Sequence, residues 1–298
     1  WRVITVTNMR ASDIANKAIP GSGYLLAILV IFGGLVFNVG NIAGAGLGLN
    51  AMVGLDPKWG GILSALLAIY IFSSRKASNF IDRMIIVLGL VMILLTVFVM
   101  FASNPPLGEA LKQTVLPDSI NFATITTIVG GTVGGYICYA GAHRLLDKGT
   151  TGIENIEAVS SAATKGILVV GLMRYILFLA ILGVVASGVT LDISSHAANP
   201  ASQAFQHAAG LTGLRIFGLI LWAAALTLAI YMMMGTAPAA LLVFAGGFNG
   251  LILPIGMTLF IFVAWRRQDL MNGYKYPAWL LWSGILVCLL TWYMGIMS

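Results

Sequence analysis

The chain has 298 residues, of which 59% are hydrophobic and only 9% are charged, and its formal net charge is +6. Soluble domains carry about 25% charged residues, so the composition excludes a soluble protein and indicates an all-α, polytopic integral membrane protein. The basic residues are spread over short loops, a pattern typical of membrane orientation and not of nucleic-acid binding. Cys138 and Cys288 lie in apolar runs without metal-ligand or disulfide spacing.

The first twenty residues are polar, mixed in charge and begin with Trp1, which is neither a signal peptide nor a natural start. We therefore expect a fragment of a longer protein. Residues 1–298 are expected to form a single transmembrane domain with about eight spans, because a helix of about 20 apolar residues crosses a bilayer. The predicted spans are 21–53, 59–73, 84–102, 120–142, 166–189, 214–234, 239–265 and 277–297.

Basic residues predict the orientation of the spans. Three Lys or Arg residues occur in each of four loops, 1–20, 74–83, 143–165 and 266–275, whereas the intervening polar connections carry at most one. The positive-inside rule therefore places these four loops in the cytoplasm, and we expect a bacterial-type inner membrane. The alternation fails after residue 213, because 214–265 has room for two spans and not for three. Either one segment there is re-entrant or a span has been lost.

The segment Thr126–Gly149 is the most unusual apolar run. Four glycines lie within the six residues Gly130–Gly135, and each costs a helix up to about 1 kcal/mol relative to alanine. In a membrane, a helix break is tolerated where the freed backbone groups meet protein, water or a ligand. We predict a discontinuous helix at 120–145 that lines a binding site. The alternative is a close helix–helix contact made by small residues.

Aromatic and ionisable residues follow the glycines. Tyr136 and Tyr139 either close over a substrate or pack with their hydroxyl groups bonded to a partner. His143 is a candidate proton relay or gate, because its ordinary pKa lies near neutrality, although a position at the membrane interface is the alternative. The spans hold almost no ionisable groups, so no catalytic residues and no cofactor are predicted and an enzyme is disfavoured.

Three asparagines lie within apolar runs. Asn38 and Asn41 share one face of the first predicted span, and Asn249 precedes a Gly-Leu-Ile-Leu-Pro sequence. Buried amides need hydrogen-bond partners, so these side chains either contribute to a binding site or bond between helices.

Three stretches carry a family resemblance: FNVGNIAGAGLGLNAMVGLDPKWGG at 37–61, GGTVGGYICYAGAHRLLDKG at 130–149 and AGGFNGLILPIGM at 245–257. They resemble the Nramp-like divalent metal cation transporters, which have the LeuT-type fold of the APC superfamily. The resemblance implies a secondary transporter that works by alternating access. It also implies that the first two family helices are largely missing, that a deletion lies near 226–235, and that this chain alone does not transport.

One motif departs from the family. Metal-transporting relatives carry Met-Pro-His-Asn in the sixth helix, where this chain has Gly134, Gly135, Tyr136 and Ile137. Without a thioether ligand, a hard cation such as Mg²⁺ or Mn²⁺ is favoured over soft metals, and the metal ligands themselves stay unassigned. A small organic acid or amino-acid-like solute, and a non-transporting membrane scaffold, are the alternatives.

The resemblance and the residue patterns together define the expected site and partners. The expected partners are the lipid bilayer, a small ion or solute as substrate, and a coupling proton or cation, with no nucleic acid. The predicted substrate-binding residues are Gly131, Thr132, Gly134, Gly135, Tyr136, Tyr139, Asn38, Asn41 and Asn249.

Overall fold

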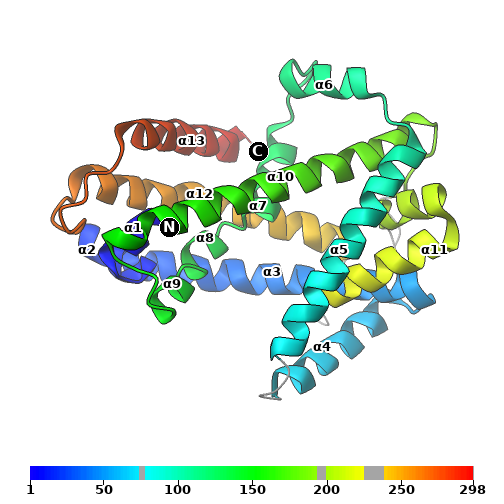
Figure 1. The fold of residues 1–298 in the computed structure, drawn as a ribbon, viewed down its shortest axis with the longest axis horizontal. Coiled ribbons are helices and arrows are strands. Elements are labelled where there is room, and N and C mark those ends of the chain that lie inside the picture. Colours follow the sequence, from blue (N-terminus) through cyan, green and yellow to red (C-terminus); the bar gives the residue numbers. More distant parts are fainter. Residues whose placement is uncertain (74–77, 193–198, 225–237, 298) are drawn as a thin grey trace. The chain divides into compact units, whose positions relative to one another are not determined.

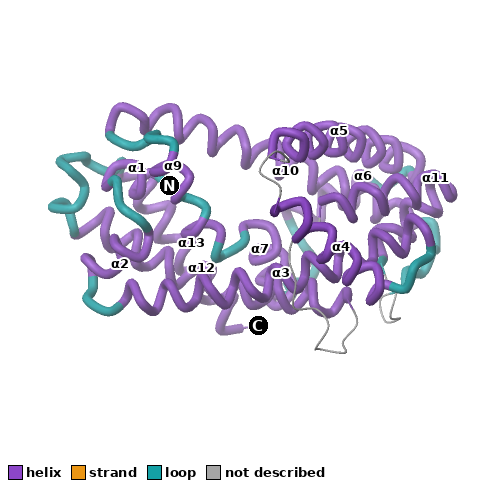
Figure 2. Tube along the Cα trace, turned by 90° about the horizontal axis from the view of Figure 1, so that it is seen from below, coloured by secondary structure: helices purple, strands orange, loops and turns teal. Residues whose placement is uncertain are grey.

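The computed structural model describes residues 1–73, 78–192, 199–224 and 238–297; of these, the side chains of 71–73, 78–86, 143–144, 224 and 238–243 are left out of the description. The described residues form helices and loops without strands (Figure 2). The prediction of an all-α fold is confirmed.

The helices have the following bounds: α1 (Arg2–Thr7), α2 (Ala11–Ala18), α3 (Ser22–Val53), α4 (Pro57–Ser73), α5 (Ser78–Ser103), α6 (Leu107–Val115), α7 (Phe122–Val133), α8 (Ile137–Ala140), α9 (His143–Asp147), α10 (Ile156–Ala186), α11 (Pro200–Ala224), α12 (Pro238–Arg266) and α13 (Ala278–Met297). A short 3₁₀ helix, Ile153–Asn155, precedes α10.

Several of these helices can cross a membrane. Among the described residues, six stretches are long and apolar enough: Ser22–Val53, Phe122–Ala140, Ile153–Ala186, Pro200–Ala223, Phe244–Arg266 and Ala278–Met297. The number rises to seven if the pair Val87–Ser103 and Leu107–Val115, which is bent by 110°, is taken as one span. The expected span at 59–73 corresponds to α4, which has 17 residues. The prediction of a polytopic membrane protein is confirmed, and the predicted deletion near 226–235 lies outside the described residues.

Two helices begin earlier than the spans that the sequence predicts. We expected a span at 166–189, preceded by an amphipathic helix in the second half of 143–165. The structure joins the two as α10, which starts at Ile156 and continues without a break. Similarly, α11 begins at Pro200 and not at 214. Proline is favoured in the first turn of a helix, and the left-handed Gly210, with φ +64°, kinks α11 where the apolar run starts.

The chain forms two compact units. The first contains Trp1–Phe37, Asn121–Leu168 and Val243–Ser298, and the second contains Asn38–Ile120 and Val169–Leu242. Both units are discontinuous in sequence, and the expectation of one transporter domain over 1–298 stays a prediction. The core of the first unit includes the fully buried side chains of Ile4, Ile14, Leu26, Ile252, Val263 and Met271.

Three of the four basic loops meet within the first unit. The Gly152 amide donates to the Thr5 carbonyl at 2.8 Å. The Arg267 guanidinium donates to the Lys17 carbonyl at 2.6 Å, and the Asn272 side chain donates to the Val6 carbonyl at 2.8 Å. The segments 1–20, 143–165 and 266–275 are therefore joined by direct hydrogen bonds within this unit, and their cytoplasmic position stays a prediction.

Candidate substrate site

Helix α7 ends at Gly134, inside the candidate span Phe122–Ala140. Gly134 has φ +62° and ψ 81°, in the left-handed region, which glycine adopts readily because it lacks Cβ. The backbone turns there and resumes as α8 and α9, so that Figure 1 shows three short ribbons in place of one straight helix. The predicted discontinuous helix at 120–145 is present.

Donors and acceptors are satisfied unequally at this break. The Gly134 amide donates to the Gly130 carbonyl at 2.9 Å, and the Ile137 amide donates to the Gly134 carbonyl at 2.7 Å. By contrast, the carbonyls of Gly131 and Thr132 receive no backbone donor within the described part of the chain. The end of α7 therefore presents free carbonyl oxygens, which a bilayer interior cannot hydrate.

The glycines also bring α7 against α12. A Cβ at Gly130 would collide with the Gly246 carbonyl and would lie 2.8 Å from the Cα of Gly250. A Cβ at Gly135 would collide with the Asn249 carbonyl. Small residues let two backbones approach this closely. The two interpretations of the glycine run thus apply to different residues: Gly134 breaks the helix, whereas Gly130 and Gly135 make a close helix contact.

Asn249 joins three segments at the break. Its side chain is fully buried. The Nδ2 group donates to the Ala245 carbonyl at 3.0 Å and to the Gly33 carbonyl on α3 at 3.4 Å, while Oδ1 accepts from the Tyr136 amide at 3.3 Å. The Tyr136 amide is thus already bonded, so this donor is not free for a substrate.

Tyr139 packs against α12 and is hydrogen-bonded to it. Its hydroxyl donates to the Leu253 carbonyl at 2.6 Å, and its ring stacks on Phe260 with centroids 5.6 Å apart. Only a glycine fits at position 256, because a Cβ there would collide with the Tyr139 ring. With 6% of its surface exposed, Tyr139 has the packing partners of a structural residue, and its contact with substrate stays a prediction.

Tyr136 lies half-buried beside α3. Its ring faces Phe37 with centroids 5.6 Å apart, and one ring carbon lies 3.5 Å from the position of a Cβ on Gly34. A Cβ on Gly33 would lie 2.9 Å from the Tyr136 Cβ. Sequence reasoning missed Gly33 and Gly34, although two adjacent glycines in an apolar run are a signal of close packing.

Two threonine hydroxyls on α7 are buried without a hydrogen-bond partner among the described residues, Thr126 Oγ1 and Thr132 Oγ1. A buried, unbonded hydroxyl costs free energy, so each such group needs an explanation. Thr132 is a predicted site residue at the end of α7, and its unbonded hydroxyl can either donate or accept a hydrogen bond. Thr126 was not predicted, because nothing in the sequence separates it from ordinary core threonines.

The structure does not test the remaining predicted residues, Asn38, Asn41 and His143. Asn38 and Asn41 are half-buried residues of α3 that belong to the second compact unit, so they are described apart from Gly134 and Asn249. The backbone of His143 begins α9, whereas its side chain lies outside the described residues. Their roles stay predictions.

The described residues contain no group of three or more His, Cys, Asp or Glu side chains that could hold a metal ion. The unbonded acceptors described at this break are neutral carbonyl and hydroxyl oxygens. Carbonyl and hydroxyl oxygens suit hard cations, which need such ligands in place of water.

A helical chain with several spanning segments, one of them broken at a glycine with free carbonyl oxygens, has the architecture of a polytopic membrane transport protein. Residues 2–237 match the family described as natural resistance-associated macrophage protein-like. The chain belongs to this Nramp-like family, which is a family of transporters and not of enzymes.

Two relatives are similar over nearly the whole chain. An uncharacterized membrane protein of Bacillus subtilis, YcsG, is 42% identical over 330 aligned positions, which cover 99% of this chain and 80% of the relative. An uncharacterized membrane protein of Haemophilus influenzae is 40% identical over 324 positions, covering 97% of this chain and 80% of the relative. Both relatives are described as membrane proteins, in agreement with the spans of this chain.

Proposed function

We propose that the chain is the core of a secondary transporter that moves a hard divalent cation, of the Mg²⁺ or Mn²⁺ kind, by alternating access. Family membership supports transport of a metal ion. The substrate class is inferred from the break after α7. There the amide donors of Gly134, Tyr136 and Ile137 are bonded, whereas the carbonyls of Gly131 and Thr132 have no donor among the described residues.

Among the described residues at this break, two free carbonyl acceptors against one free amide donor, that of Gly135, favour a cation. The C-terminal end of a helix carries about half a negative charge from the aligned peptide dipoles, which adds to the field of the Gly131 and Thr132 carbonyls. A transported ion must also leave again, so neutral oxygens are a reasonable choice of ligand. The predicted LeuT-type fold, the coupling to a proton or cation gradient, and the cytoplasmic position of the basic loops belong to the same proposal.

A small organic acid is the second candidate. A carboxylate would need free amide N–H groups, as half-helix N-termini provide in other transporters. At this break the Gly135 amide is the donor without a bonded carbonyl among the described residues, which is a weak basis for anion binding. A non-transporting scaffold would leave the free carbonyls without a role.

Binding of Mn²⁺ by the purified chain in lipid nanodiscs tests the proposal. The decisive variant is Gly134→Ala, because alanine disfavours φ +62° and its Cβ would approach Ile137 at 3.0 Å, which disturbs the break. The matched control is Gly149→Ala, at φ +65° with nothing within 4 Å. It carries the same backbone strain away from the site.

We expect the Mn²⁺ signal of electron paramagnetic resonance to show binding that Gly134→Ala weakens about tenfold or more, the scale of changes next to metal ligands. Gly149→Ala should bind as the parent does. Equal Mn²⁺ binding by both variants would show that the helix break at Gly134 is not part of the cation site. Absence of Mn²⁺ and Mg²⁺ binding, with stabilisation by a panel of small carboxylic acids, would favour the second candidate.

A further inference from the structure

Helix α6 turns sharply away from the spanning helix before it. Val87–Ser103 and Leu107–Val115 are inclined at 110° to each other. Asn104, with φ +47°, and the two prolines that follow it end α5, because proline cannot continue a helix. If Val87–Ser103 crosses the bilayer, α6 lies close to the plane of the membrane surface.

One face of α6 is apolar and exposed. Leu107, Leu111 and Val115 follow one another at four-residue spacing and therefore share a face. They are 55%, 61% and 76% exposed. The exposed side chains of Phe98 and Phe101 lie on the last turns of α5 before the bend. Exposed apolar side chains thus occur on both sides of the bend between α5 and α6.

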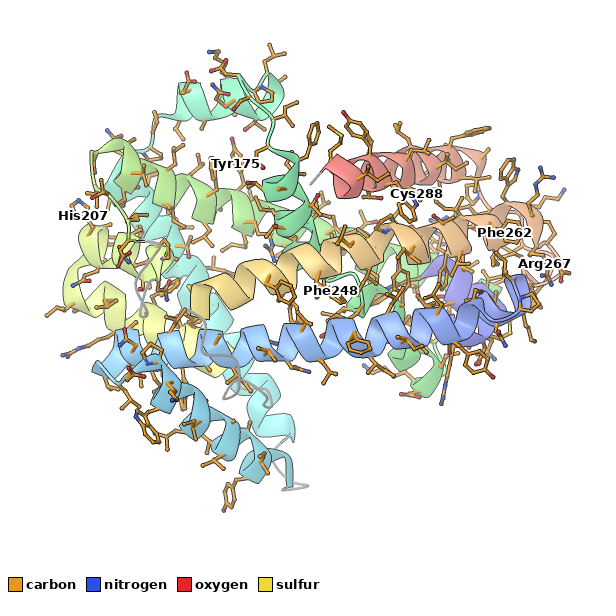
Figure 3. The ribbon with its side chains drawn as sticks, turned by 180° about the vertical axis from the view of Figure 1, so that it is seen from behind. Tyr175, His207, Phe248, Phe262, Arg267 and Cys288 are labelled. Carbon is orange, nitrogen blue, oxygen red and sulfur yellow. The ribbon has the colours of Figure 1, made fainter. Side chains whose placement is uncertain are left out.

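The helix surface on both sides of this apolar stripe makes packing or polar contacts. Ala110 is 4% exposed, and the Thr114 hydroxyl lies 3.1 Å from the Tyr175 hydroxyl of α10, the helix on which Figure 3 labels Tyr175. On the polar face, the Gln113 side chain donates to Glu109 at 2.8 Å and also bonds Asp118. The stripe is therefore held outward by bonded neighbours on both sides.

We propose that α6 is an interfacial helix, whose stripe of Leu107, Leu111 and Val115 inserts into the boundary between lipid headgroups and acyl chains. The occupant is lipid, because the helix runs near the membrane plane and the spanning helix α5 also ends in exposed apolar side chains, Phe98 and Phe101. The nearby charges are mixed, with Glu109, Lys112 and Asp118 in contact. Insertion therefore rests on apolar area and not on attraction to anionic lipids.

Spin labels on the full chain in phosphatidylcholine proteoliposomes test this proposal. Cys138 and Cys288 are first replaced by alanine, and single cysteines are then introduced as Leu111→Cys in the stripe and as Lys112→Cys on the polar side of the helix. Collisions with oxygen, which concentrates in lipid, are compared with collisions with a water-soluble nickel chelate. Val115→Cys and Glu109→Cys form a second pair in case one variant fails to fold.

We expect the ratio of oxygen to nickel accessibility to be several-fold higher at Leu111 than at Lys112, with the same order at Val115 and Glu109. Adding phosphatidylglycerol should leave the ratio unchanged. Equal nickel accessibility on both faces would overturn the proposal, since α6 would then be in water. Protection of Leu111 from both reagents would also overturn it, by showing that protein covers the stripe.

Discussion

At the scale of single residues, Asn249 has the largest structural role at the break. One buried amide bonds to Gly33, Ala245 and Tyr136, which lie on three different segments. Its loss would leave the Tyr136 amide without a partner in a setting where water does not replace it. A buried unsatisfied group costs about 1–3 kcal/mol.

We predict that Asn249→Leu lowers the free energy of unfolding by about 1–3 kcal/mol, because leucine fills a similar volume but bonds to none of the three partners. Thermal unfolding in detergent micelles measures the change. Asn50→Leu is the control, since the Asn50 side chain makes one hydrogen bond, to the Leu55 carbonyl. A loss at Asn249 no larger than that at Asn50 would contradict the joining role.

A variant of Tyr139 tests whether this side chain serves packing or substrate binding. Tyr139→Phe keeps the stack on Phe260 and removes the hydrogen bond to the Leu253 carbonyl. We predict a loss of about 1 kcal/mol in unfolding free energy, the usual net value of one hydrogen bond, with Mn²⁺ affinity retained. Tyr24→Phe, on a residue that is 74% exposed, should leave stability unchanged. Unchanged stability together with lost Mn²⁺ binding for Tyr139→Phe would instead assign the hydroxyl to the site.

Asp269 gives a prediction for pH. The Arg267 guanidinium donates two hydrogen bonds to this carboxylate, at 2.8 and 2.7 Å, and so holds the pKa of Asp269 below its ordinary value. The pair therefore stabilises the loop above the ordinary carboxyl pKa of about 4, and this contribution disappears as the pH falls through the lowered value.

A spin label at Gln268→Cys, again with Cys138 and Cys288 replaced by alanine, should thus become more mobile when the pH falls below about 4. Adding Asp269→Asn should make the same label mobile at neutral pH and remove the pH dependence. Identical label mobility with Asp and with Asn at pH 7 would show that the pair does not order the loop.

At the scale of elements, the contact between α7 and α12 is the one least tolerant of added volume. We predict that Gly130→Ala destabilises the protein by about 1–3 kcal/mol or more, the cost of overpacking, because its Cβ meets the backbone of Gly246 and Gly250. Gly89→Ala on α5 is the matched control, since nothing lies within 4 Å of its Cβ. The control should be neutral or slightly stabilising, as alanine is the better helix former. Equal effects of both variants in thermal unfolding would contradict the contact.

The sequence predicted these elements better than it predicted their contacts. A glycine run in an apolar stretch indicated the break at Gly134, because the cost of glycine in a helix is local. The partners of Asn249 and Tyr139 were not predictable, since Gly33 and Leu253 are distant in sequence and ordinary in type. The early start of α11 was missed because the polar residues there gave no apolar signal.

At the scale of the whole molecule, the hydrogen bonds between basic loops bear on topology. Arg267 and Asn272 bond to the segment 1–20, in keeping with our proposal that the loop after α12 and the N-terminal segment lie on the same side of the membrane. An even number of crossings must then separate them. The elements α3, α4, α5, α7 with α8, α10, α11 and α12 would give seven if each crossed once, which is odd.

We therefore propose that α10, α11 and α12 do not each cross the membrane once. This is in line with the predicted loss of a span near 226–235. The 330 aligned positions of the Bacillus relative exceed the 298 residues of this chain, so the relative has segments without a counterpart here.

Single cysteines in whole cells, in a background lacking Cys138 and Cys288, test on which side of the membrane each loop lies. A membrane-impermeant maleimide should label Lys112→Cys in intact cells, but should reach Lys148→Cys and Gln268→Cys only after permeabilisation. Labelling of Gln268→Cys in intact cells, with Lys148→Cys protected, would place the two loops on opposite sides and would contradict both the hydrogen bonds and the charge rule.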